Sequence, residues 1–192
     1  MSNTPDLRSK VEGIALIAAF TLTVPLANWM IGNVGTVCVP DGPCLVPVAP
    51  GLLAPSGVLV AGLAFVLRDF VQQRLGAIWA IAAIVAGAVI SATIAPPALV
   101  IASAAAFLVS ELADMAVFTP LRRRGLLLAV FASSVVGLFV DTLIFLQLAF
   151  GNTALMWGQI VGKSWMVVLA LPLVHLLQTR RASAGPIEGA QA

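Results

Sequence analysis

The sequence predicts an all-α membrane protein, in which six transmembrane helices form a compact bundle and both termini face the cytoplasm. Two observations of composition support this fold class. Of the 192 residues, 60% are hydrophobic and 9% are charged, whereas soluble domains carry about 25% charged residues. A membrane-spanning helix needs about 20 apolar residues, so six of them consume nearly the whole chain. A disordered chain and a soluble catalytic or nucleotide-binding domain are therefore excluded.

Charged residues and turn residues divide the chain into six apolar runs. Residues 1–12 are expected to form a cytoplasmic N-terminal segment, residues 13–178 the six-helix domain, and residues 179–192 a disordered cytoplasmic tail. The expected spans are 13–31, 53–71, 77–95, 98–118, 126–150 and 155–177. Pro96-Pro97 and Gly151-Asn152-Thr153 predict tight turns after the third and fifth spans.

The basic residues between the runs predict the orientation. The connections after the second and fourth spans and both ends of the chain carry Lys or Arg, for example Arg122-Arg123-Arg124 after the fourth span. The alternate segments 32–52, 96–97 and 151–153 contain neither residue. Since cytoplasmic loops are enriched in Lys and Arg, both termini are expected inside, in a multi-pass protein of the cytoplasmic (inner) membrane.

The two cysteines, Cys38 and Cys44, lie in the expected outer segment and enclose a Pro-Asp-Gly-Pro turn. An oxidising compartment allows a disulfide between them. Two unpaired thiols remain the alternative. A metal site is not expected, because no His or further Cys lies nearby.

Ionisable side chains inside the spans are costly, so they mark a functional site or an internal ion pair. At a rise of about 1.5 Å per residue, Asp141 and Lys163 lie at nearly the same depth and are expected partners. Glu111 and Asp114 are three residues apart and share one helix face. For Arg68 and Asp69 two interpretations are equally good. They belong to a site inside the bundle, or they mark the end of a helix, where Arg68 extends to the cytoplasmic interface.

The surplus of carboxylates predicts a polar ligand that offers several N–H donors. One carboxylate can accept two parallel hydrogen bonds from a ring N–H and an exocyclic amine, and a flat heterocycle also requires an aromatic face. No catalytic residue or metal ligand is expected. The candidate substrate-binding residues are Arg68, Asp69, Phe107, Ser110, Glu111, Asp114, Asp141, Phe145, Gln159, Lys163 and Trp165.

Four short motifs, in order along the chain, resemble those of the queuosine precursor transporter family, also described as vitamin uptake transporters. Residues 68–76, Arg-Asp-Phe-Val-Gln-Gln-Arg-Leu-Gly, resemble its Asp-x-x-x-Glu-x-Tyr-Gly motif, with Gln73 and Leu75 in place of Glu and Tyr. Ser103 with Ser110-Glu111-Leu112-Ala113-Asp114 resembles its fourth-helix pattern. Ser133-Ser134 with Asp141-Thr142 and Phe145 resembles its fifth-helix motif, and Lys163 falls where its sixth helix carries Lys.

The resemblance implies uptake of a 7-deazaguanine such as 7-cyano-7-deazaguanine for tRNA modification salvage. It carries over Asp69, Asp114, Asp141 and Lys163 as site positions. The expected partners are then this substrate and the lipid bilayer, without cofactor or nucleic acid, and a homo-oligomer stays open.

Two other functions fit parts of the sequence. A substrate-binding subunit of an ATP-driven energy-coupling-factor vitamin transporter has the same size and helix number, and Ala15 and Ala19 would form its small-residue docking face. The chain lacks a Gly-x-x-x-x-Gly-Lys-[Ser/Thr] loop, so the ATPases would be separate chains. An intramembrane enzyme is disfavoured, because His-Glu-x-x-His and Gly-x-Ser-x-Gly are absent.

Overall fold

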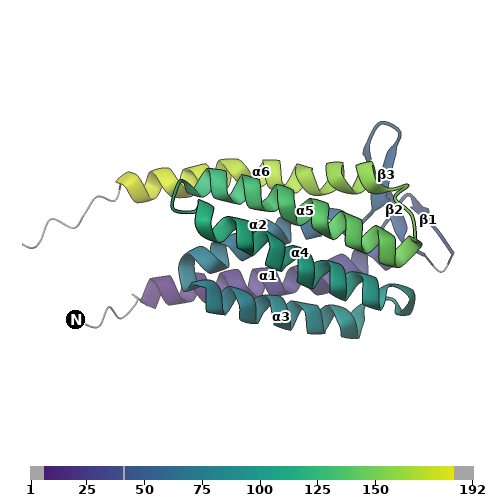
Figure 1. Cartoon of the computed structure of the whole chain (residues 1–192), viewed down its shortest axis with the longest axis horizontal. Helices are drawn as coiled ribbons and strands as arrows, with labels where there is room; N and C mark the ends of the chain where they lie inside the picture. The colour runs from purple at the N-terminus through teal and green to yellow at the C-terminus, as the bar shows by residue number, and fades with distance from the viewer. Residues whose placement is uncertain (1–6, 41, 184–192) are drawn as a thin grey trace, which may run out of the picture.

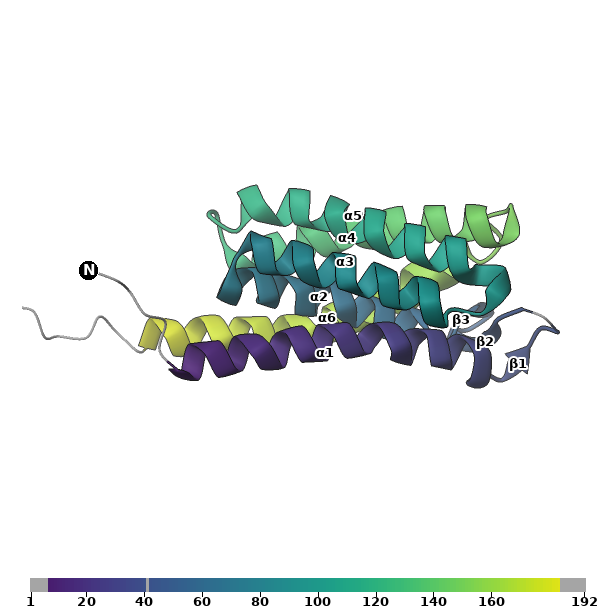
Figure 2. The ribbon, with the colours of Figure 1, turned by 90° about the horizontal axis from the view of Figure 1, so that it is seen from below.

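The computed structural model describes residues 7–40 and 42–183 and consists of a bundle of long helices with a small sheet at one end (Figures 1 and 2). The start of α1 and the end of α6 lie at the end of the bundle opposite the sheet (Figure 1). The elements, in chain order, are α1 (Leu7–Asn33), β1 (Val37–Cys38), β2 (Cys44–Ala49), β3 (Leu52–Pro55), α2 (Val58–Leu75), α3 (Ala77–Ile94), the 3₁₀ turn η1 (Pro97–Leu99), α4 (Val100–Leu121), α5 (Leu126–Phe150) and α6 (Met156–Ser183).

Four segments of the described chain are long and apolar enough to cross a membrane, and they support a multi-pass membrane protein. They are Val11–Asn33, Ala77–Ile94, Pro97–Leu121 and Leu126–Phe150. The other two long helices, α2 and α6, carry the polar residues of the interior, among them Arg68, Asp69 and Lys163. That these two also cross the membrane, and that both termini are cytoplasmic, stay predictions.

Helix α2 is the centre of the bundle, because it packs against each of the other five long helices. Eleven of its 18 residues are buried, from Val58 to Gln72. Such complete enclosure explains why a helix with several charged residues belongs inside: its polar side chains meet the polar side chains of neighbouring helices rather than lipid.

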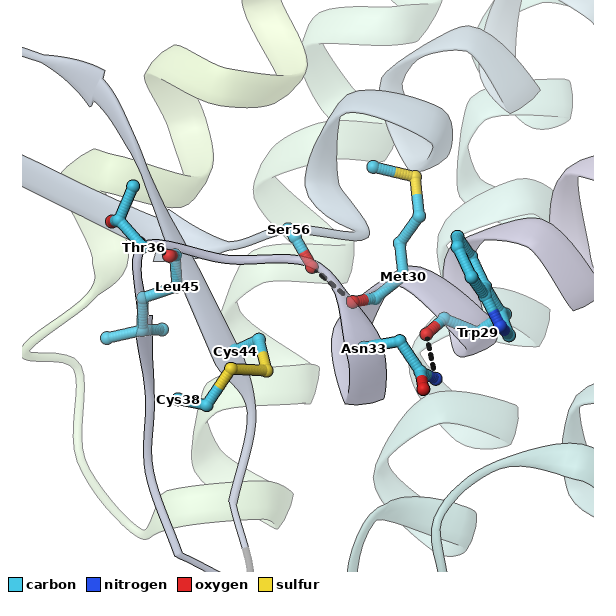
Figure 3. Close-up of a disulfide and its surroundings, with 8 residues drawn as sticks. All are labelled: Trp29, Met30, Asn33, Thr36, Cys38, Cys44, Leu45 and Ser56. Atoms are coloured by element: carbon cyan, nitrogen blue, oxygen red, sulfur yellow. Dashed lines mark hydrogen bonds between the residues drawn. A yellow bond between two sulfur atoms is a disulfide. The ribbon is translucent and has the colours of Figure 1, made fainter.

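Residues 37–55 form a three-stranded antiparallel sheet in the order β1-β2-β3. Cys38 pairs with Cys44 in the register of β1 and β2, and a disulfide joins them (Figure 3). Gly51 makes the turn between β2 and β3 with φ +73°, a conformation that glycine adopts without a steric penalty.

This sheet corrects the all-α prediction and the start of the second helix. Residues 52–55 pair with β2, so α2 begins at Val58 rather than at residue 53. Pro55-Ser56-Gly57 separates the strand from the helix and is itself a turn signal, which the predicted span starting at residue 53 overlooked. The end of α6 is also later than expected: residues 179–183 are helical, and the predicted disorder of 184–192 lies outside the described residues.

Two glycines bring the polar helices close together. A Cβ on Gly62 of α2 would lie 2.9 Å from the Cα of Lys163 on α6. A Cβ on Gly137 of α5 would lie 3.0 Å from the Cβ of Asp114 on α4. Small residues at such crossings allow the backbones of membrane helices to approach, and here they place Lys163 and Asp114 in the interior.

Helix α6 is also tied to the sheet. The Trp165 indole Nε1 donates a hydrogen bond to the Val48 carbonyl oxygen at 3.0 Å. Gly158 lies directly against the Leu53 carbonyl group, where a side chain would clash. The sheet therefore holds the end of α6 that carries Gln159 and Lys163.

Candidate functional site

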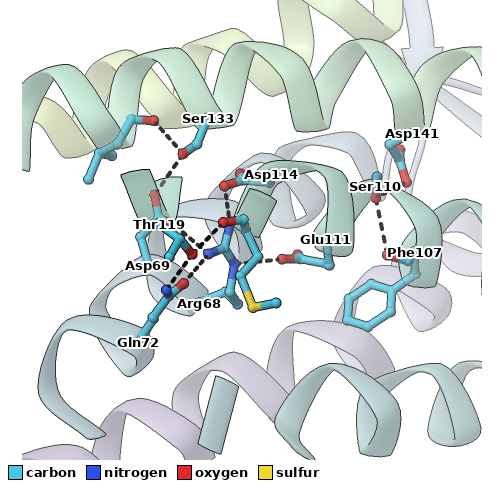
Figure 4. A network of polar contacts seen from close by, with 12 residues as sticks. Arg68, Asp69, Gln72, Phe107, Ser110, Glu111, Asp114, Thr119, Ser133 and Asp141 are labelled. Carbon is cyan, nitrogen blue, oxygen red and sulfur yellow. Dashed lines mark hydrogen bonds and ion pairs between the residues drawn. The ribbon is translucent and has the colours of Figure 1, made fainter. Parts of the chain in front are cut away.

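The first of two buried polar clusters surrounds Arg68, and we call it the Arg68 cluster (Figure 4). It consists of Arg68, Asp69 and Gln72 on α2 and of Glu111 and Asp114 on α4, each at most 1% exposed. Because no solvent screens these charges, the cost of burying each one must be offset by its partners inside the cluster.

The guanidinium group of Arg68 contacts all three carboxylates. Its Nε donates to Glu111 Oε2 at 3.3 Å, and its Nη2 donates to Asp114 Oδ1. Its Nη1 lies 2.8 Å from Asp69 Oδ1 and donates to Gln72 Oε1 at 3.0 Å. The Phe118 ring covers the guanidinium, with its centroid 5.6 Å from Cζ. A planar group with five donors suits such a set of acceptors better than a lysine would.

Hydroxyl groups complete part of the cluster. Ser133 on α5 donates to Asp69 Oδ2 at 3.0 Å, and Gln72 Nε2 donates to Thr119 Oγ1 at 2.8 Å. Two carboxylate oxygens, Asp69 Oδ1 and Asp114 Oδ2, have no hydrogen-bond partner among the described residues. The cluster is therefore well packed but not fully satisfied, which is costly in an interior.

The second cluster is built on the ion pair between Lys163 of α6 and Asp141 of α5. Lys163 Nζ lies 2.5 Å from Asp141 Oδ2, and it also donates to Thr142 Oγ1 at 2.9 Å and to Gln159 Oε1 at 2.6 Å. The predicted pairing of Asp141 with Lys163 is thereby confirmed. Lys163 is 1% exposed, whereas Asp141 retains 16% exposure.

A cavity of about 90 Å³ lies beside this second cluster, and all six long helices and β3 contribute to its wall. One water molecule needs about 10–15 Å³ by the same measure, so the cavity is several waters in size. Phe107 and Phe145 supply aromatic faces. The polar residues on its wall are Thr23, Asn28, Ser91, Ser103, Asp141, Gln159 and Lys163.

Gln159, which lines this cavity, has an amide donor that is not used. Its side chain is 1% exposed, its Oε1 accepts from Lys163, and its Nε2 has no partner among the described residues. The assignment of oxygen and nitrogen follows from chemistry, because a lysine only donates and must face the amide oxygen. A buried amide nitrogen without an acceptor is a position at which a ligand acceptor would be stabilised.

The structure brings five of the predicted substrate-binding residues to the cavity or its ion pair and places four others elsewhere. Phe107, Asp141, Phe145, Gln159 and Lys163 line the cavity. Arg68, Asp69, Glu111 and Asp114 form the Arg68 cluster, away from that wall. Ser110 lies between the two regions. Its hydroxyl group is 3.1 Å from the Phe107 carbonyl oxygen and 3.4 Å from Asp141 Oδ1, either of which can accept its proton, while Glu111, the next residue, contacts Arg68.

Two sequence interpretations are corrected here. Arg68 is not a helix-end residue that reaches the interface, because its side chain is fully buried and bound to acids of α4. Trp165 does not line the cavity: it is 51% exposed and bonds to the sheet. Helix periodicity alone does not show which face of α6 a tryptophan occupies.

The sequence interpretation omitted several cavity residues. Thr23 and Asn28 in the first apolar run and Ser91 in the third are polar side chains inside membrane-length segments. That position is itself a signal, since polar groups within spans face the bundle interior. The candidates predicted from the sequence all came from the second, fourth, fifth and sixth apolar runs, and polar side chains of the first and third were therefore missed.

One protein family has a model that matches this chain. It is described as "Putative vitamin uptake transporter", and the match covers residues 91–177. This stretch includes α4, α5 and most of α6, and therefore Asp141, Gln159 and Lys163. No curated protein and no solved structure matches the chain. The match covers fewer than half of the residues, and together with the apolar helices it supports a multi-pass membrane protein similar to transporters.

Proposed function

We propose that this protein imports a queuosine precursor, 7-cyano-7-deazaguanine or a related 7-deazaguanine, through the cytoplasmic membrane. The substrate would bind in the cavity beside Asp141 and Lys163. The observation that carries this proposal is the adjacency of a carboxylate and an unpartnered amide donor, since Asp141 and Gln159 both contact Lys163 Nζ, at 2.5 and 2.6 Å.

These two groups complement the edge of a guanine-like ring. That edge presents a carbonyl oxygen, a ring N–H and an exocyclic amine in a row. The Asp141 carboxylate would accept from the two donors, as carboxylates do from arginine, and Gln159 Nε2 would donate to the carbonyl oxygen. Phe107 and Phe145 would flank the ring plane.

The substitution Gln159→Glu tests this arrangement at one atom. The Glu carboxylate would still accept from Lys163 but would replace the unpartnered amide donor with an acceptor. Leaving the ligand carbonyl unpaired costs about 1–3 kcal/mol, so we expect the dissociation constant for 7-cyano-7-deazaguanine to rise roughly 5- to 150-fold. Equilibrium dialysis with purified protein measures this change.

A matched ligand serves as the control for this variant. The 6-deoxy analogue of the substrate lacks the carbonyl oxygen and also the ring N–H, because its N1 becomes an acceptor. It should therefore bind the native protein more weakly than the substrate does, yet lose little further affinity in Gln159→Glu. Equal losses for both ligands would show that Gln159 does not read the carbonyl group, and native affinity in the variant would place the pocket elsewhere.

Transport itself is tested in cells that cannot synthesise the precursor. Expression of this chain should restore queuosine in tRNA when 7-cyano-7-deazaguanine is supplied outside. Uptake by the purified chain alone in liposomes would distinguish a self-sufficient transporter from a substrate-binding subunit that requires ATPase chains. Failure in liposomes with success in cells would favour the energy-coupling-factor arrangement.

The proposed orientation predicts which side of the membrane a thiol reagent reaches. Cys44→Ser frees Cys38, an exposed residue of β1, and we expect a membrane-impermeant maleimide to label it in intact cells. In the background Cys38→Ser/Cys44→Ser, a thiol introduced by Arg123→Cys should be labelled only after permeabilisation. The reverse pattern would invert the proposed topology.

A further inference from the structure

The Arg68 cluster contains more negative groups than positive ones. One guanidinium group faces the carboxylates of Asp69, Glu111 and Asp114, and all four side chains are at most 1% exposed. If every group were ionised, two negative charges would be uncompensated. An uncompensated buried charge is far more costly than a neutral, protonated carboxyl group.

The two unsatisfied oxygens show where a proton fits. Asp69 and Asp114 bind neighbouring nitrogens, Nη1 and Nη2, of the same guanidinium, which holds their carboxyl groups side by side. Asp114 Oδ2 has no hydrogen-bond partner among the described residues, and Asp69 Oδ1 has only its ion pair with Arg68 Nη1. Two carboxylates accept only, but a single proton would make one of them a donor to the other.

We propose that Asp69 and Asp114 share one proton, and that the Arg68 cluster releases and rebinds it during the transport cycle. The proton-binding site goes beyond the proposed function, whereas its coupling to transport rests on that function. Paired carboxyl groups in other proteins share a proton for the same reason, namely that two adjacent carboxylates cannot both remain ionised. Carboxylates within membrane spans also act as proton relays in transporters.

The surroundings of the cluster offer no other described charge that could neutralise it. Helix α3 contains no ionisable residue, and Glu12 of α1 pairs with Arg74 at the end of α2. Lys163 of α6 is occupied by Asp141 of α5. His175 of α6 is exposed, and Ser133 supplies only a hydroxyl group.

Helix α4 provides a physical connection from the proton to the substrate cavity. The Ser110 hydroxyl group is 3.4 Å from Asp141 Oδ1, within reach of a hydrogen bond to a residue that lines the cavity, and Glu111 bonds to Arg68. A ligand that draws Asp141 toward its own donors would shift α4 at Ser110, and with it the contacts of Glu111. Loss or gain of the shared proton changes the same contacts from the other side, which is the reciprocity that coupling requires.

Infrared spectroscopy of the purified protein tests the proton without any substrate. A protonated carboxyl group has a carbonyl stretching band that a carboxylate lacks, and this band shifts in heavy water. We expect the band in the native protein at neutral pH and its loss in both Asp69→Asn and Asp114→Asn. In Glu12→Gln, which removes a carboxylate outside the cluster, the band should persist. Its absence from the native protein would overturn the proposal.

Liposome experiments test the coupling. With 7-cyano-7-deazaguanine outside and a pH-sensitive dye inside, substrate entry into liposomes with native protein should acidify the lumen. Asn at position 114 resembles a permanently protonated Asp, so Asp114→Asn should still exchange labelled for unlabelled substrate but lose accumulation driven by a pH gradient. Asp69→Asn serves as the second variant if the first does not fold.

The outcomes separate the two proposals. If the infrared band is present but no 7-cyano-7-deazaguanine enters, the shared proton is supported, whereas the proposed substrate and its coupling to the proton are contradicted. If the substrate enters without acidification, or accumulates on a sodium gradient instead, the proton coupling is overturned while the proposed function stands.

Discussion

Replacement of Arg68 by Gln is expected to lower the free energy of unfolding by about 3–5 kcal/mol, because it leaves buried carboxylates without their counter-charge. Arg68 contacts Asp69, Glu111 and Asp114 together, so its replacement weakens the interaction between α2 and α4. Denaturant titration in detergent micelles, followed by the fluorescence of the four tryptophans, measures the effect.

Two matched variants distinguish the geometry of Arg68 from its charge. Arg68→Lys retains the charge but not the planar set of donors, and it should recover only part of the loss. Arg74→Gln removes an arginine of the same helix whose ion pair with Glu12 is partly exposed, and it should cost less than about 1 kcal/mol. If Arg68→Gln unfolds at the same denaturant concentration as the native protein, the cluster does not stabilise the fold.

The second large effect is expected at the ion pair beside the cavity. Lys163→Met leaves Asp141 without its cation and should destabilise the protein by about 3–5 kcal/mol. The double variant Asp141→Asn/Lys163→Met removes both charges, so its free energy of unfolding should exceed that of Lys163→Met. The same denaturant titration measures both.

Binding and stability should separate in this double variant. It loses the carboxylate proposed to accept from the substrate, so it should fold without recovering uptake of 7-cyano-7-deazaguanine. A double variant no more stable than the worse single variant would show that Asp141 and Lys163 do not act as a pair, despite their distance of 2.5 Å.

The positions of the helices could be read from the sequence, because a membrane segment is defined by an apolar run that charge or turn residues interrupt. Pro96-Pro97 does separate α3 from α4, and Gly151 does end α5. The sheet was not predicted, because residues 53–55 were assigned to the second span although Pro55-Ser56-Gly57 interrupts it. Only their pairing with β2 identifies them as a strand.

The contents of the candidate site were predictable in part for a similar reason. Depth along a helix follows from residue number, and it correctly paired Asp141 with Lys163. Rotation between helices does not follow from residue number, so the sequence assigned Glu111 and Asp114 to the same pocket as Asp141. The structure turns them toward Arg68 instead.

The enclosure of α2 has a consequence for the biosynthesis of the chain. The acids of α4 that bind Arg68 lie 43 and 46 residues after it, and Ser133, which bonds to Asp69, lies 64 residues after that aspartate. A charged residue at the centre of an isolated membrane helix costs about 2.5–3.5 kcal/mol during insertion. While α2 is being synthesised, these later partners do not yet exist. If α2 crosses the membrane as proposed, it therefore settles into the bilayer only after α4 has emerged, and the two helices enter the bundle as one unit.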